Sequence, residues 1–121
     1  MRKLARDDEQ QHLQQNAVCV RLSNVFDPRQ ELAQHGSNWA ADIQHEFIAE
    51  CRQFGPLLHV HVDSVDSSGT VHVRFATSDA ARACYDRLHG RYFDKRQLQG
   101  QLVSVQEYER RFPDSGRGAP L

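Results

Sequence analysis

Alternating apolar and polar positions predict four β-strands in this chain. Along residues 57–63, Leu58, Val60 and Val62 would point to one side of a sheet, while the two intervening histidines point to the other. This period of two residues is typical of a strand that buries one face. The strands predicted in this way are residues 17–22, 57–63, 69–75 and 101–105.

Apolar positions spaced three or four residues apart predict a helix over residues 39–54. Ile43, Phe47, Cys51 and Phe54 share one face of that helix, and Gly55 followed by proline should end it. A second helix has a small apolar face and begins at Thr77 or Ser78. The residues of that face are Ala80, Ala81, Cys84 and Leu88.

Turn-forming residues predict the remaining segments as loops. Residues 23–38 contain Asp27-Pro28 and Gly36 and are predicted as a loop, in which Ser37 or Asn38 caps the next helix. Two further segments are predicted after the second helix: residues 91–100 as a loop or short hairpin, and residues 106–112 as one or two helical turns.

The element order is β-α-β-β-α-β, which predicts an α+β fold. Right-handed crossovers then produce a four-stranded antiparallel sheet with both main helices on one face, followed by a short C-terminal helix. The polar, glutamine-rich residues 1–16 are predicted as a frayed or disordered leader. Residues 17–112 form the domain, and residues 113–121, rich in Gly and Pro, are predicted as a disordered tail.

Composition narrows the class of protein further. Apolar residues make up 39%, charged residues 26%, and the net charge is −1, so the overall basic charge typical of nucleic-acid binding is absent. The three cysteines form no CxxC pair, which indicates free thiols in a reducing compartment. Neither a membrane-spanning stretch nor a signal peptide is recognisable. No nucleophile–base motif, phosphate loop or metal spacing is present, so we expect no enzyme activity and no cofactor.

Two features point to a binding site between the first helix and the segment after the second. Asp42, Glu46 and Glu50 repeat every four residues, so their carboxylates lie along one stripe of the helix. Arg91-Tyr92-Phe93 follows Gly90, where the second helix should end. An acidic stripe beside a basic-aromatic loop favours binding of a cationic peptide that carries an aromatic side chain.

This element order, with two strand motifs, resembles the RNA-recognition motif (RRM). Residues 18–23 and 68–75 take the places of the two ribonucleoprotein motifs of that family. RRMs stack RNA bases on outward aromatic rings, whereas the corresponding positions here hold Cys19, Thr70 and His72. Because each stacked base is worth roughly 1–3 kcal/mol, this surface is predicted to bind RNA poorly.

Within that superfamily the chain resembles the U2-auxiliary-factor homology motif (UHM), whose members bind short peptides with a tryptophan among basic residues. Arg91, Tyr92 and Phe93 match its Arg-X-Phe signature, and the acidic stripe matches its first helix. The resemblance is greatest to the C-terminal UHM of the CAPER-alpha family of splicing coactivators. It is carried by residues 22–28, Trp39, Glu50-Cys51, residues 88–93 and residues 112–115.

The resemblance implies how a ligand tryptophan is held. It would insert between the first helix and the 91–93 loop, with Phe93 edge-to-face on the indole. Arg91 would cover the ring and pair with Glu50. Phe47 or Ile43 would form the floor. Asp42 and Glu46 would remain for ligand arginine or lysine residues N-terminal to the tryptophan.

The same resemblance implies a nuclear adaptor that acts in pre-mRNA splicing at the 3′ splice site. The implied partners are splicing factors with tryptophan-containing basic motifs, among them the scaffold subunit of the U2 branch-site complex and the large subunit of the U2 auxiliary factor. No membrane or small-molecule substrate is implied.

Other interpretations remain open at this stage. An RNA-binding RRM would use Arg74, Arg96 and His72 with loop residues, and a homodimerisation domain would use the sheet or the N-terminal segment. Trp39, at a helix start, is expected to anchor the core.

Two small groups of side chains remain to be interpreted. His59, His61 and His72 would face outward near Cys19, yet no spacing supplies a fourth zinc ligand. In the last helix, Tyr108 and Phe112 lie four residues apart, so they would cover the sheet face or pack at its edge.

Overall fold

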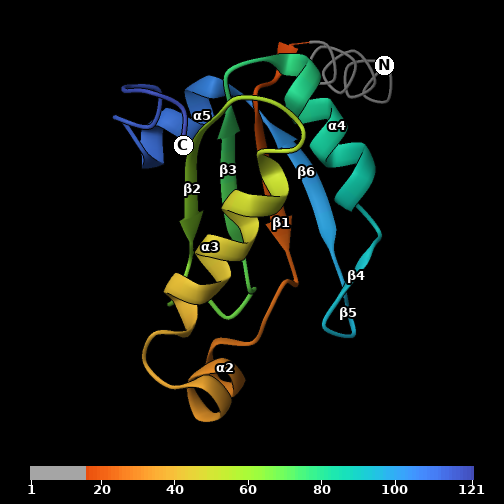
Figure 1. Cartoon of the computed structure of the whole chain (residues 1–121), viewed down its shortest axis with the longest axis vertical. Coiled ribbons are helices and arrows are strands. Elements are labelled where there is room, and N and C mark those ends of the chain that lie inside the picture. Colours follow the sequence, from red (N-terminus) through yellow and green to blue (C-terminus); the bar gives the residue numbers. More distant parts are fainter. Residues whose placement is uncertain (1–15) are drawn as a thin grey trace, which may run out of the picture.

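The computed structural model describes residues 16–121, and the predicted leader 1–16 lies almost wholly outside them. One sheet has the strand order β2-β3-β1-β6, with every neighbouring pair antiparallel. The helices α3 and α4 cover one face, and α5 lies on the other (Figure 1). The predicted α+β fold is confirmed. The strands of this sheet are β1 (Cys19–Ser23), β2 (Leu57–Val62), β3 (Val71–Phe75) and β6 (Gln99–Val103).

The two main helices form where the apolar spacing places them, but the first ends at Cys51 rather than at residue 54 as predicted. Helix α3 (Trp39–Cys51) buries Trp39, Ile43, Phe47 and Cys51. Helix α4 (Ser78–Leu88) buries the predicted face of small residues. Its N-cap, Thr77, accepts a hydrogen bond from the Ala80 N–H at 3.2 Å.

A further helix, α2 (Pro28–His35), replaces the loop that the sequence predicted over residues 23–38. Asp27 is its N-cap and accepts a hydrogen bond from the Arg29 N–H at 3.0 Å, and Pro28 occupies the first helical position. Proline is favoured there because that N–H has no helical partner. The Asp-Pro pair therefore begins a helix, and the prediction of a loop was wrong.

Strand β2 also differs from its predicted alternation. The register with β3 shifts between Leu57 and His59, so one extra residue, Leu58, is accommodated in a bulge. Leu57 is consequently buried at 1% exposure and Leu58 only half-buried. The prediction that Leu58 points inward was wrong at this position, while Val60 and Val62 are buried as expected.

After α4 the chain forms the hairpin that the sequence allowed as one alternative. Its strands are β4 (Tyr92–Phe93) and β5 (Arg96–Gln97), and they form a separate two-stranded sheet. Asp94 and Lys95 between them both have positive φ, 50° and 69°, which is the backbone of a type I′ turn.

The last helix, α5 (Val105–Arg111), is followed by turns. The sequence predicted residues 113–121 as disordered, but here Ser115 is buried and the Leu121 N–H donates to the Leu57 carbonyl at 2.7 Å. Contact with the sheet, which local composition does not report, accounts for this difference.

Candidate ligand site beside the β4–β5 hairpin

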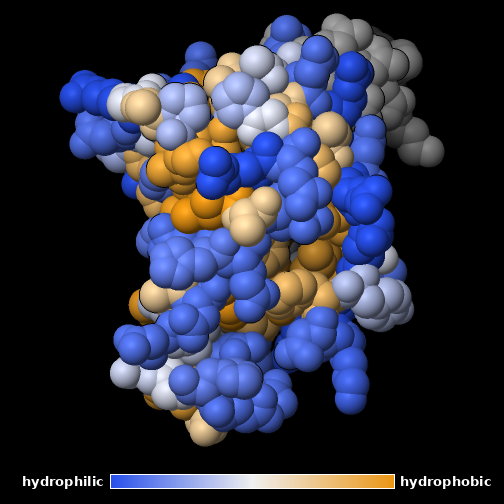
Figure 2. Space-filling view, in the orientation of Figure 1, coloured by the Kyte–Doolittle hydropathy of each residue, from blue (hydrophilic) through white to orange (hydrophobic). Residues whose placement is uncertain are grey.

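A pocket of about 470 Å³ opens between α3 and the β4–β5 hairpin. Its base is apolar, and its rim carries two carboxylates from α3 and the Arg91 side chain. Figure 2 shows apolar surface between the polar outer side of α3 and the hairpin side of the molecule. We call it the aromatic pocket. Its lining residues are Glu46, Phe47, Ala49, Glu50, Gln53, Leu88, Arg91, Tyr92, Phe93 and Leu98.

The hairpin forms one wall of this pocket because backbone hydrogen bonds close its base. Gly90, at φ +83°, donates to the Leu98 carbonyl at 2.8 Å, and Leu98 donates to the Arg91 carbonyl at 2.7 Å. Successive side chains of a strand alternate in direction. Tyr92 is accordingly 71% exposed, whereas Phe93 packs on Phe47 of α3, with ring centroids 5.6 Å apart and planes at 56°.

A second pocket, of about 480 Å³, adjoins the first and shares Glu46 and Phe93 with it. We call it the acidic pocket because four carboxylates surround its aromatic and aliphatic base. One of them, Glu31, comes from α2 and lies 3.7 Å from the His35 imidazole. The lining residues are Glu31, His35, Trp39, Asp42, Ile43, Glu46, Phe93 and Asp94.

All eight residues predicted for the site line at least one of the two pockets. Glu46, Phe47, Glu50, Arg91, Tyr92 and Phe93 line the aromatic pocket, and Asp42 and Ile43 line the acidic one. Phe47 and Ile43, the two residues predicted as the floor, thus line different pockets. The ion pairs of residues 16–121 do not include the expected Arg91–Glu50 pair.

Sequence reasoning missed several lining residues. Leu98 is buried at 2% because it follows the hairpin directly, and only the turn geometry brings it there. Glu31 and His35 were missed with their helix. Asp42, Glu46 and Asp94 form no ion pair within the described residues, so their carboxylates are available to a cationic ligand.

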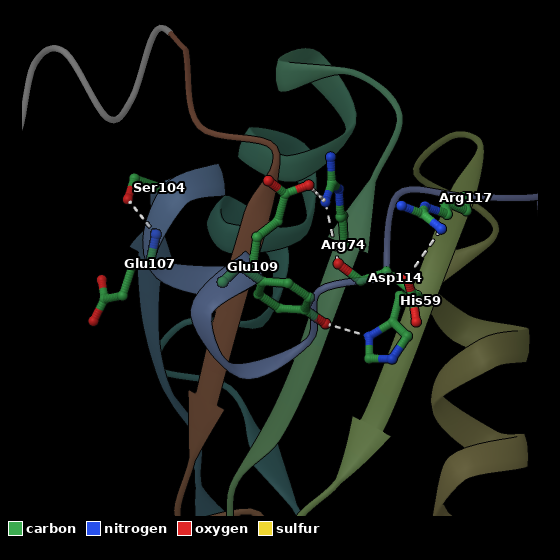
Figure 3. A network of polar contacts seen from close by, with 9 residues as sticks. His59, Arg74, Ser104, Glu107, Glu109, Asp114 and Arg117 are labelled. Carbon is green, nitrogen blue, oxygen red and sulfur yellow. Dashed lines mark hydrogen bonds and ion pairs between the residues drawn. The ribbon is translucent and has the colours of Figure 1, made fainter.

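Tyr108 and Phe112 cover the opposite face of the sheet. This is the first of the two alternatives predicted for them, the other being packing at the edge of the sheet. Tyr108, 3% exposed, hydrogen-bonds through its hydroxyl to His59 Nδ1 at 2.7 Å (Figure 3). The Phe112 ring lies 4.9–5.2 Å from the rings of His59, His61 and His72. Two of the three strand positions on which RRMs stack bases, Cys19 and His72, therefore lie beneath α5 and the residue that follows it.

Buried titratable groups on this face are held neutral. Burial raises the pKa of the Cys19 thiol to about 12, and it also raises the pKa of Tyr108. Burial, together with nearby positive charge, lowers the pKa of His72 to about 4 and that of His59 below its ordinary value. These groups pack the face as uncharged side chains at neutral pH.

The cationic residues of the RNA-binding alternative are engaged within the domain. Arg74 donates to Glu109 Oε2 at 2.8 Å and to the Ser115 hydroxyl at 3.1 Å (Figure 3). Arg96 donates to Asn24 Oδ1 at 2.9 Å. His72 is buried beneath Phe112.

No group of three or more His, Cys, Asp or Glu side chains in residues 16–121 is placed to hold a metal ion. None of the helices in that part of the chain has the length and apolar character needed to cross a bilayer.

Comparisons with known proteins agree on the fold. The family model described as RNA recognition motif matches residues 44–99. The mouse (Mus musculus) inner nuclear membrane protein Man1 is 28% identical over 97 residues, which are 80% of this chain but only 10% of that protein. The RRM structure of RNA15 superposes with a TM-score of 0.51 at 14% identity, covering 76% of this chain and 95% of that one. The family match covers less than half of the chain, and the structural likeness shows that the chain has an RRM-like fold.

Proposed function

We propose that this domain captures short peptides in which a tryptophan stands among basic residues. The observation that carries the proposal is the contrast between the two sides of the molecule. The sheet face that would stack RNA bases is covered by Tyr108 and Phe112, while an aromatic pocket with an acidic rim is open on the helix side. The UHM resemblance of Arg91-Tyr92-Phe93 supports the same conclusion.

The aromatic pocket suits an indole ring in size and chemistry. Phe47 and Phe93 present ring faces and edges, and tilted aromatic pairs gain about 0.5–1.5 kcal/mol beyond the burial of area. Arg91, exposed at the rim, would stack on the indole. Since Glu50 also lines the rim without an ion pair to Arg91, we propose that the ligand brings these two residues together.

The acidic pocket would take a basic side chain of the same peptide. The α3 residues that line the two pockets are centred about five to six positions apart, which corresponds to about 8 Å along the helix axis. An extended peptide covers that distance in about two to three residues. We therefore propose an arginine or lysine about two to three residues N-terminal to the tryptophan, near Asp42 and Glu46, with Glu31 and Asp94 adding to the negative field.

The expected affinity is moderate. Burying an indole removes roughly 150–250 Å² from water, worth about 4–6 kcal/mol at 25 cal/mol/Å². Ion pairs with the exposed carboxylates add to this, and ordering the peptide opposes it. A low-micromolar Kd, about −8 kcal/mol, with moderate dependence on salt, is the expected result.

Calorimetric titration with a basic peptide carrying one central tryptophan tests the proposal. Binding should disappear for the Trp→Ala peptide and for the Phe93→Ala and Glu50→Lys proteins. Asp86→Lys is the matched charge reversal, because Asp86 is exposed on α4 and lines neither pocket. A folded wild-type domain that binds neither peptide would refute the proposal.

RNA binding is the second candidate, and the RNA recognition motif match favours it. RNA affinity would fall steeply with salt and would not respond to Phe93→Ala. Titration with RNA oligonucleotides at two salt concentrations separates this outcome from peptide capture. Self-association, the remaining alternative, would show as a mass that rises with protein concentration.

We further propose a nuclear location, and splicing factors with tryptophan-centred basic motifs as partners. The similar mouse protein Man1 is by name an inner nuclear membrane protein, which supports the nuclear location. The splicing role rests on the CAPER-alpha resemblance. Pull-down from nuclear extract by the wild-type domain, with Phe93→Ala as control, should recover the branch-site scaffold subunit and the large U2 auxiliary factor subunit. Failure to recover either would overturn the splicing assignment.

A further inference from the structure

The hairpin that forms one wall of the aromatic pocket has few attachments to the rest of the domain. Its two strands form a sheet of their own, with two residues in each, and isolated hairpins of this kind are marginally stable in water. The packing of Phe93 on Phe47 and the burial of Leu98 attach its pocket side. These contacts do not attach the other strand, β5, to the rest of the domain.

Asn24, the residue after β1, contacts β5 through both ends of its side-chain amide. Asn24 Nδ2 donates to the Gln97 carbonyl at 2.9 Å, and Asn24 Oδ1 accepts from Arg96 at 2.9 Å. The Asn24 backbone N–H donates to the Ser68 carbonyl, also at 2.9 Å. One residue thus joins the end of β1, the β2–β3 turn and the hairpin.

Unusual backbone conformations coincide with this connection. Among residues 16–121, the non-glycine residues with positive φ are Asn24 at 62°, Asp94 at 50° and Lys95 at 69°. Such conformations are disfavoured for most L-residues and persist where surrounding structure holds them. Two of the three form the hairpin turn, and the third is its anchor.

Asparagine meets every requirement of the anchor position. Its side chain offers a donor and an acceptor together, and it tolerates the left-handed conformation better than other non-glycine residues. Aspartate would keep the acceptor for Arg96 but place an oxygen against the Gln97 carbonyl. Glycine would keep the backbone and lose both side-chain contacts.

We propose that Asn24 is a positioning residue for the aromatic pocket: by holding β5 it fixes the hairpin, and with it Phe93, in the place that ligand binding requires. This inference rests on the proposed peptide function. Asn24 lines neither pocket, so its effect on a ligand would pass through the hairpin.

Two readouts on Asn24→Gly test the proposal. The affinity for the tryptophan peptide should fall by about fivefold to tenfold, in keeping with two partly exposed hydrogen bonds. By NMR, the hydrogen-bonded amides of Gly90 and Leu98 should exchange faster, while amides of the β1–β3 pairing remain unchanged. Asn24→Asp should give a smaller change of the same direction in both readouts.

Arg96→Ala keeps Asn24 and removes one of the two contacts, so it should produce a smaller loss than Asn24→Gly. Unaltered peptide affinity in Asn24→Gly and Arg96→Ala, even with a lowered unfolding midpoint, would reduce Asn24 to a stability role and overturn the proposal. If the wild-type protein binds no peptide, the proposed function fails. The amide exchange of Gly90 and Leu98 then still decides whether Asn24 holds the hairpin.

Discussion

Acidification should destabilise this domain because His72 is buried in its neutral form. The His72 ring is 5% exposed and lies 5.2 Å from that of Phe112. Its Nε2 atom has no hydrogen-bond partner within the described residues. Burial, and then the charges of Arg111, His61 and Arg21, lower the pKa of His72 from 6.5 to about 4, while Asp63 acts in the opposite direction.

The sign and size of the effect follow from this difference in pKa. Because the folded-state pKa lies below the unfolded-state value, the unfolded chain binds the proton more readily. The free energy of unfolding therefore falls as the pH decreases from about 6.5 to about 4, and this contribution changes no further below that. The whole difference would amount to about 3 kcal/mol of unfolding free energy.

Two neighbouring titratable groups also affect stability. One acts in the same direction as His72, and the other acts below the pH range in which His72 titrates. The pKa of His59 is also lowered, chiefly by burial, so His59 adds to the loss of stability on acidification. Burial alone would raise the pKa of Asp63, but hydrogen bonds from the Asp66 and Val65 N–H groups and the Arg111 charge lower it overall. Its contribution is lost only as the pH falls below about 3.8.

Urea unfolding followed by the fluorescence of the single tryptophan, Trp39, measures the effect. The free energy of unfolding should be compared at about pH 7.5 and about pH 4.5. His72→Phe should lose a large part of the pH dependence that the wild type shows. His45→Gln, at an exposed position of α3, is the matched control and should keep it. Parallel loss of stability in wild type and His72→Phe would refute the reasoning.

Three further substitutions test the fold. Gly69→Ala should cost more than about 2 kcal/mol of unfolding free energy in a urea titration. Gly69 has φ +64°, and an added Cβ would lie 2.0 Å from the Phe26 carbonyl oxygen. Gly118→Ala, which has open space around it, should cost less in the same titration. Tyr108→Phe removes the hydroxyl contact to His59 and should lower the free energy of unfolding by about 0.5–1.5 kcal/mol. An unchanged unfolding midpoint would contradict this prediction. Asp27→Ala removes the N-cap of α2 and should destabilise that helix by about 1 kcal/mol, seen as faster amide exchange in α2 but not in α4.

The periodicity of apolar residues predicted the elements that face the core. Ile43, Phe47 and Cys51 are buried because each is one helical turn from the next. Helix α2 buries none of its residues, so no apolar period marked it, and only its Asp-Pro start could have revealed it. The bulge at Leu58 was invisible because it depends on the partner strand.

The candidate site was predictable where a short stretch of sequence carries it. The acidic stripe lies on one helix and Arg91-Tyr92-Phe93 on one hairpin, so local spacing was sufficient. Leu98 and Glu31 enter the pockets through the hairpin and α2. The contact of Asn24 with Gln97 joins residues 73 positions apart, which no local pattern reports.

The central position of β1 also affects how the domain folds during synthesis. Cys19 pairs with Arg74 on one side and with Val103 on the other, so both partner strands leave the ribosome long after β1. Contacts between such distant residues slow folding. Until residues 99–103 have been made, β1 has one unpaired edge, to which another nascent chain could add a strand. A chaperone that shields β1 should therefore raise the folded yield more than one that binds α4.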